Sequence, residues 1–204
     1  MKKINLILIL LLSTLLAAQT TQELYQKLSA RYSNLKSFQA DVSQENHFVQ
    51  INKTLSYTGK LYFQKDRMLM SFTSPSVQRL MIHNGFAELY DADSKTLFKS
   101  RVEPQFNKMN PIEILEHFWQ KSELKILENK GGKSRVRLTP AKDPLISSLE
   151  ATLDNHSGLV SSLSYTDKSS NRVSYKFSNI NLDKPIPASV WNFSYPKNIQ
   201  VIEQ

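Results

Sequence analysis

The most constraining feature of this sequence is a period of two in its hydrophobic residues, repeated in many short segments. Apolar and polar residues alternate through residues 38–43 and again through residues 57–65. Successive side chains of a β-strand point to opposite faces, so this period is typical of strands with one buried face. Asn84–Gly85 and Gly131–Gly132 stand between such segments, and such pairs favour tight turns. The alternation therefore predicts an antiparallel sheet in which consecutive strands are neighbours.

Two segments have the period of a helix instead. The first covers residues 23–35, where apolar residues recur at three- and four-residue spacing: Leu24, Leu28, Tyr32 and Leu35. The second follows Asn110–Pro111, a pair that suits the cap and first turn of a helix. One face of this second helix then carries Ile112, Leu115, Phe118 and Trp119.

We therefore expect a single mainly β (α+β) domain. Its core is a strongly curved antiparallel sheet of eleven or twelve strands, accompanied by two or three short helices. The strands are expected near residues 38–43, 57–65, 68–72, 79–83, 86–90, 96–101, 124–128, 134–139, 149–153, 159–165, 172–180 and 190–195.

The amino terminus has the pattern of a secretory signal peptide. Two lysines precede an apolar run that ends at Ala18, and polar residues follow. This run is shorter and more interrupted than a membrane span of roughly 20 apolar residues. We expect residues 1–18 to be removed, by cleavage after Ala17 or Ala18, which leaves residues 19–204 as the domain. The chain contains no cysteine, so we expect a periplasmic product that is soluble and carries no lipid anchor.

The charge and the motifs argue against several classes of function. The net charge is +8, or +6 without Lys2 and Lys3, which suits plain solubility or attraction to an anionic lipid or an acidic partner. No basic and aromatic motif of a nucleic-acid-binding module occurs in this exported chain. The four histidines lack metal-ligand spacing, and no nucleophile elbow or phosphate-binding loop is present. We therefore expect no catalytic residues, no cofactor, no metal and no nucleic-acid partner.

An apolar binding face is what the sequence offers instead. A curved sheet with alternating strands can have one apolar, concave face, which a helix can cover, and such a cavity binds an apolar ligand through buried area. Methionine adapts to ligands of varied shape. We expect this face to be lined by Leu61, Phe63, Met68, Met70, Phe72, Leu163 and Tyr165 from the strands and by Ile112, Leu115, Phe118 and Trp119 from the second helix. The sequence leaves open the alternative that these residues are ordinary core.

Several short motifs, in their order along the chain, resemble the periplasmic lipoprotein carrier family (LolA-like). No single motif is specific, and the resemblance comes from their order and spacing over nearly the whole mature chain. The motifs are LKSFQADV at residues 35–42, GKLYF at 59–63, RMLMSFTSP at 67–75, NG at 84–85, LYD at 89–91, NPIEIL at 110–115, LTP at 138–140 and FSYPKNIQV at 193–201.

The resemblance implies an unclosed antiparallel β half-barrel of about eleven strands under a helical lid. It also implies a function, in which the cavity holds the acyl chains of a lipoprotein during transfer from the inner to the outer membrane. The implied partners are the acylated lipoprotein cargo, an inner-membrane releasing transporter (LolCDE-like) and an outer-membrane acceptor (LolB-like). We expect the carrier to be a monomer.

The sequence departs from the family at the residue that latches the lid. The family often has Arg-Pro or Lys-Pro there, and its arginine helps to latch the lid, whereas this chain has Lys65 followed by Asp66; lysine keeps the charge but loses the planar fork of donors. Lys65 is therefore the candidate lid latch. Departures of this kind leave the cargo open, and the alternative is a LolA-like carrier or sensor for another acylated ligand such as a glycolipid. A periplasmic hydrolase using the same cavity is a third hypothesis, for which the sequence shows no residues.

Overall fold

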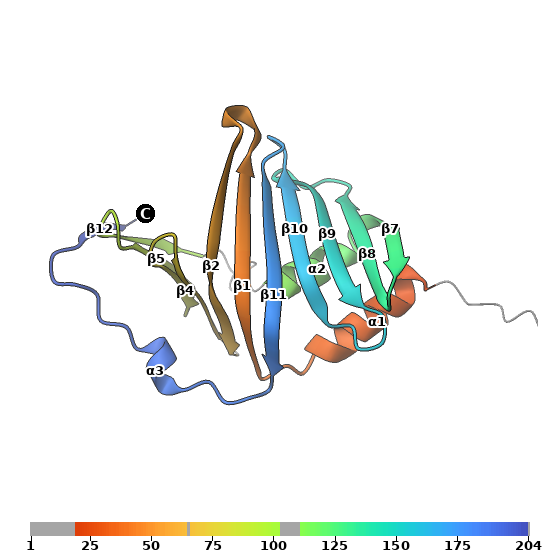
Figure 1. The fold of residues 1–204 in the computed structure, drawn as a ribbon, viewed down its shortest axis with the longest axis horizontal. Helices are drawn as coiled ribbons and strands as arrows, with labels where there is room; N and C mark the ends of the chain where they lie inside the picture. The colour runs from red at the N-terminus through yellow and green to blue at the C-terminus, as the bar shows by residue number, and fades with distance from the viewer. Residues whose placement is uncertain (1–18, 65, 103–110, 204) are drawn as a thin grey trace, which may run out of the picture.

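The computed structural model describes residues 19–64, 66–102 and 111–203, which form one large sheet and three short helices (Figure 1). The helices are α1 (Thr21–Tyr32), α2 (Pro111–Trp119) and α3 (Ala188–Trp191), and a 3-10 turn, η1 (Val49–Ile51), follows the first strand. The strands before α2 are β1 (Ser37–Phe48), β2 (Lys53–Gln64), β3 (Arg67–Ser74), β4 (Gln78–His83), β5 (Phe86–Asp91) and β6 (Thr96–Arg101). The strands after α2 are β7 (Ser122–Lys130), β8 (Lys133–Pro140), β9 (Ile146–Asp154), β10 (Val160–Asp167), β11 (Arg172–Leu182) and β12 (Gln200–Glu203).

The twelve described strands form one sheet whose two edges do not meet. Their order is β12-β6-β5-β4-β3-β2-β1-β11-β10-β9-β8-β7. Strands β1–β6 make one antiparallel meander and β7–β11 make another, and the pairing of β1 with β11 joins the two. β12 pairs with β6 in parallel, so the expectation of antiparallel pairing throughout is wrong at this edge. The sheet is the unclosed, strongly curved half-barrel that the sequence predicts (Figure 1).

Local sequence determines where the elements begin and turn. The Thr20 hydroxyl accepts a hydrogen bond from the Glu23 backbone N–H at 3.2 Å, and the Glu23 carboxylate accepts one from the Thr20 N–H at 2.9 Å. This capping box starts α1 at Thr21, two residues before the start that periodicity alone indicates. Asn84 and Gly85 have positive φ angles of 50° and 78° and form the predicted two-residue turn between β4 and β5.

Different parts of the chain cover the two faces of the sheet. α1 and α2 lie on the concave face, where their main contacts are with β7, β8 and β10 (Figure 1). The C-terminal segment (residues 183–199), which includes α3, crosses the opposite, convex face. Tyr62 and Leu69 lie on this convex face, together with Val190 and Phe193 of the C-terminal segment.

The prediction of a strand near residues 190–195 is wrong. This stretch contains the end of α3 and irregular chain, and the last strand begins only at Gln200. The Trp191 ring lies 6.5 Å from the Tyr62 ring, and the Phe193 ring lies 5.7 Å from the Tyr90 ring. Trp191 and Phe193 stand at alternate positions because both side chains turn toward the surface of the sheet. The segment nevertheless lies across the sheet and does not join its hydrogen-bonded ladder.

Candidate functional site

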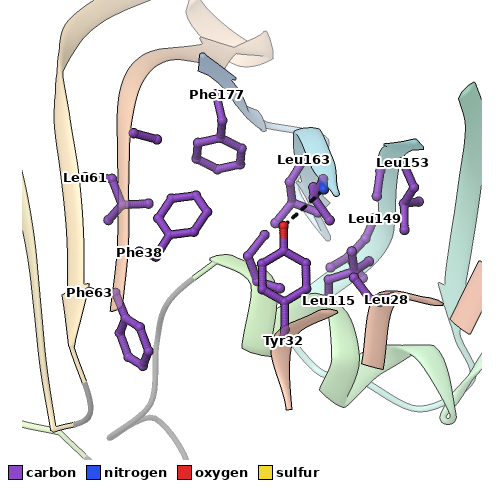
Figure 2. Close-up of a cluster of buried hydrophobic side chains, with 14 of the residues drawn as sticks. Leu28, Tyr32, Phe38, Leu61, Phe63, Leu115, Leu149, Leu153, Leu163 and Phe177 are labelled. Carbon is purple, nitrogen blue, oxygen red and sulfur yellow. Dashed lines mark hydrogen bonds between the residues drawn. The ribbon is translucent and has the colours of Figure 1, made fainter. Parts of the chain in front are cut away.

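One apolar cluster fills the concave face beneath α1 and α2. It draws side chains from both meanders and from both helices, and Figure 2 shows them converging from opposite sides. Phe118 and Tyr165 are half-buried at its margin. The other nine residues singled out in the sequence are buried within it: Leu61, Phe63, Met68, Met70, Phe72, Ile112, Leu115, Trp119 and Leu163. The structure therefore brings all eleven to one face.

One row of register partners shows how this face changes from the centre of the sheet to its edge. The row passes through consecutive strands as Ala40, Leu61, Met70, Leu80, Leu89, Phe98 and Ile202. Met70 is 5% exposed, whereas Leu89 is 38% exposed and Phe98 is 39% exposed. Among the described residues, this row of the concave face is thus covered over β1–β3 and remains apolar but open over β5 and β6.

Polar contacts fasten α1 to the turn between β9 and β10. The Lys27 ammonium donates to the Asn155 carbonyl oxygen, and the Arg31 Nε donates to the Ser157 carbonyl oxygen at 3.0 Å. The Tyr32 hydroxyl accepts a hydrogen bond from the Val160 N–H at 3.1 Å, drawn as the dashed line in Figure 2. These three contacts hold α1 to β7–β11, the meander that follows α2 in the chain.

Gly158 permits the close approach of α1 to this turn. Its φ is +71°, a left-handed conformation that side chains with a Cβ rarely adopt. A Cβ on Gly158 would lie 2.4 Å from the Lys27 carbonyl carbon and 2.7 Å from the Leu28 nitrogen. The helix backbone therefore rests directly on a position that only glycine fits.

Sequence reasoning missed this attachment and proposed Lys65 as a latch. Lys65 lies outside the described residues. Lys27 and Arg31 are one helical turn apart, and their partners follow more than a hundred residues later in the chain. The sequence Asn-His-Ser-Gly at residues 155–158 does predict a turn with a left-handed residue. Nothing in the local sequence indicates that α1 packs against this turn.

Removing the Tyr32 hydroxyl tests the inner part of this attachment. Tyr32→Phe leaves the buried Val160 N–H without a partner, so we expect the free energy of unfolding to fall by about 1–3 kcal/mol. Urea denaturation followed by circular dichroism measures this difference. A Tyr32→Phe protein as stable as the parent would show that the hydrogen bond contributes nothing.

The same variant predicts a change in pH dependence. Burial raises the pKa of Tyr32 to about 12, above its unfolded value of 10.0. The folded state therefore favours the protonated phenol, and this contribution is complete below pH 10.0 and is lost as the pH rises towards 12. Between these pH values the parent should lose more stability than Tyr32→Phe does.

α2 is held mainly by its apolar face. Ile112, Leu115 and Trp119 are buried in the concave cluster. The Trp119 ring also lies 5.9 Å from the Tyr25 ring of α1, and the Gln120 side-chain N–H donates to the Tyr25 hydroxyl at 2.8 Å. The two helices thus cover the concave face as a pair.

The tyrosines of the facing wall stay neutral. Burial raises the pKa of Tyr165 on β10 and of Tyr175 on β11. The Tyr175 ring stacks on the Phe177 ring at 6.3 Å with the two planes almost parallel. The wall that these residues form is therefore uncharged and aromatic, which suits an apolar ligand.

Comparison with known proteins places this fold in a family. The family model of the outer membrane lipoprotein carrier protein LolA matches residues 33–194. An outer-membrane lipoprotein carrier protein of Pseudoalteromonas translucida (strain TAC 125) is 24% identical over 221 residues, which cover 100% of this chain and 98% of that protein.

Solved structures show the same fold at low sequence identity. An uncharacterized conserved protein from Thermus thermophilus has a TM-score of 0.57 and 12% identity, covering 91% of this chain and 100% of that one. MucB has a TM-score of 0.54 and 12% identity, covering 89% of this chain and 65% of its own. Within the described residues, no helix is long and apolar enough to cross a membrane. Because the family model covers most of the sequence, the chain belongs to the family of the outer membrane lipoprotein carrier protein LolA.

Proposed function

We propose that this chain binds the acyl chains of lipoproteins on its concave face and carries them from the inner to the outer membrane. Family membership supports a carrier-like role. The observation that carries the proposal is the apolar row that is buried at Met70 and exposed at Leu89 and Phe98. An acyl chain gains about 0.8 kcal/mol for each CH₂ that it buries, so a continuous apolar surface suits it.

The two covering helices have different roles in this proposal. α1 is fixed to the β9–β10 turn by Lys27, Arg31 and Tyr32. α2 contributes buried apolar residues that an entering acyl chain would replace. Because the empty protein already buries these residues, the net gain on binding is smaller than the area alone suggests, and the cargo can be released.

The proposed route follows from the sequence and the family. Residues 1–18 act as a signal peptide, and the remaining chain is one soluble, unlipidated periplasmic domain. A LolCDE-like transporter of the inner membrane loads the monomeric carrier, and a LolB-like acceptor of the outer membrane unloads it.

Photo-crosslinking tests the face and the cargo together. A crosslinker at Phe63, on the concave face, should capture an acylated lipoprotein in cells, to be identified by mass spectrometry. A crosslinker at the adjacent Tyr62, on the convex face, is the matched control and should capture none. Capture of a glycolipid at Phe63 would support the alternative acyl ligand, and equal capture at both positions would exclude the concave face as the site.

A further inference from the structure

The two most exposed large apolar side chains among the described residues lie at the same end of the sheet. Ile51, in η1 after β1, is 68% exposed, and Leu145, in the turn after β8, is 67% exposed. Val49 of η1 is 46% exposed. β1, β8 and β10 run in one direction, because each neighbouring pair of strands between them is antiparallel. The turns that follow these three strands therefore lie at one end, which is at the top of Figure 1.

Hydrogen bonds join these three turns. The Val49 N–H donates to the Asn171 side-chain oxygen at 3.2 Å, which connects η1 to the β10–β11 turn. The Lys168 N–H of that turn donates to the Leu145 carbonyl oxygen at 3.0 Å, which connects it to the β8–β9 turn. Residues 49–52, 141–145 and 168–171 thus form one continuous surface, which we call the turn surface.

Exposed lysines accompany these apolar tips. Lys142 and Lys168 lie in the turn surface, and Lys53 follows it at the start of β2. All three residues are exposed, and none forms an ion pair with a described residue. A lysine stem can lie along apolar surface while its ammonium group reaches outward, so these cations are available to an anionic partner.

The carboxylates at this end are bound within the turns. Asp143 accepts hydrogen bonds from the backbone N–H groups of Leu145 and Ile146 at 2.9 and 2.7 Å. Asp167 accepts one from the Asn171 backbone N–H at 2.8 Å and one from the Asn171 side-chain amide at 3.0 Å. Both aspartates are half-buried, whereas the lysines are exposed. A surface that approaches this end therefore meets the lysines and the apolar tips first.

We propose that the turn surface docks on an anionic lipid bilayer. Val49, Ile51 and Leu145 enter the headgroup region, and the lysines contact the lipid phosphates. Apolar side chains bordered by cations bind the interface of an anionic membrane through buried area and electrostatic attraction together. The tips of the hairpins stand several strand spacings of about 5 Å apart. A fluid bilayer accommodates such separate tips, whereas a protein partner would need a matching hollow for each.

This docking goes beyond the proposed carriage of acyl chains and does not rest on it. The turn surface shares no described residue with the apolar cluster of the concave face. Few side chains enter the lipid, so the docking is reversible and weakens when salt screens the lysines. It gives the chain a direct contact with lipid that needs no receptor.

Sedimentation of the exported protein with vesicles at low salt tests the apolar tips. The parent should bind phosphatidylglycerol vesicles and not phosphatidylcholine vesicles. Ile51→Ser and Leu145→Ser should each weaken binding about fivefold, because an apolar side chain no longer enters the interface. Phe86→Ser is the matched control: Phe86 is 43% exposed but lies in the β4–β5 hairpin at the opposite end of the sheet, so its variant should bind like the parent.

Paired lysine variants test the cations at equal net charge. Lys142→Gln combined with Lys168→Gln should weaken binding to phosphatidylglycerol vesicles about tenfold, because two ammonium groups leave the membrane surface. Lys130→Gln combined with Lys133→Gln removes the same charge from exposed positions at the β7–β8 turn, which lies at the opposite end. This second pair should bind nearly as well as the parent.

A tryptophan at the tip gives a direct measure of insertion. The native Trp119 and Trp191 are buried, with exposed fractions of 3% and 8%, so they give a constant background. Fluorescence of Ile51→Trp should shift to shorter wavelength on phosphatidylglycerol vesicles and be quenched by brominated lipid, whereas Phe86→Trp should show neither change.

The proposal is wrong if the parent does not bind phosphatidylglycerol vesicles or binds phosphatidylcholine vesicles equally well. It is also wrong if the variants at the opposite end lose as much binding as those of the turn surface. Ile51→Ser should leave the binding of a fluorescent fatty acid unchanged, so failure of membrane docking leaves the proposed acyl-binding function separately testable.

Discussion

Gly158→Ala is expected to lower the free energy of unfolding by about 3 kcal/mol or more, a larger effect than at Gly131 or Gly132, where a Cβ meets nothing within 4 Å. A new Cβ meets the Lys27 carbonyl carbon at 2.4 Å, so α1 has to move away from the β9–β10 turn. That movement weakens the contacts of Arg31 and Tyr32 as well. Urea denaturation gives the loss of stability, and hydrogen exchange in α1 should increase with it.

Gly132→Ala is the matched control for this loss. Gly132 also has a left-handed φ, +73°, but a Cβ there meets nothing within 4 Å. Gly132→Ala should therefore lower the free energy of unfolding only through backbone strain, by about 1–2 kcal/mol. Equal losses in the two variants would show that backbone conformation, and not contact with α1, makes Gly158 necessary.

Leu89→Glu is expected to weaken acyl binding at least about tenfold while the protein stays folded. Leu89 is 38% exposed on the open part of the concave face, so a carboxylate can stay hydrated there in the empty protein. An acyl chain lying along the row from Met70 to Phe98 would have to remove that water, and an ionised carboxylate resists burial. Displacement of a fluorescent fatty acid measures the change.

Phe86→Glu provides the control on the same strand. Phe86 is 43% exposed and three positions before Leu89, which places it on the opposite face of β5. The Phe86→Glu substitution introduces the same charge as Leu89→Glu at a similarly exposed position, and it should leave acyl binding unchanged. If Phe86→Glu weakened binding as much as Leu89→Glu, a general effect of charge would explain both, and the concave assignment would be wrong.

Much of the fold can be read from the sequence because strand faces and hairpin turns have local signals. The alternation at residues 57–63 reports burial of one face, and the Asn84–Gly85 turn fixes the register of β4 and β5. The same alternation is misleading at Trp191 and Phe193. It records that one side of the segment faces the sheet, but contains nothing about whether the backbone pairs with a neighbouring strand.

The candidate site is less predictable because it depends on contacts between distant parts of the chain. Leu61 and Leu163 share one apolar cluster only through the pairing of β1 with β11. The attachment of Lys27 and Arg31 uses backbone carbonyl oxygens, which every residue offers and no sequence pattern marks.

The place of β1 in the middle of the sheet has a consequence for how the molecule forms. β1 is the first strand made, yet one of its two neighbours is β11, with Phe38 opposite Leu182. Until the last quarter of the chain has appeared, that side of β1 is an unpaired edge open to association with other chains. Pairing across so long a separation closes a large loop and makes folding slow. Because β12 then adds to β6, the meander of β1–β6 reaches its final form only after β12 has been made, and the newly made chain needs protection until then.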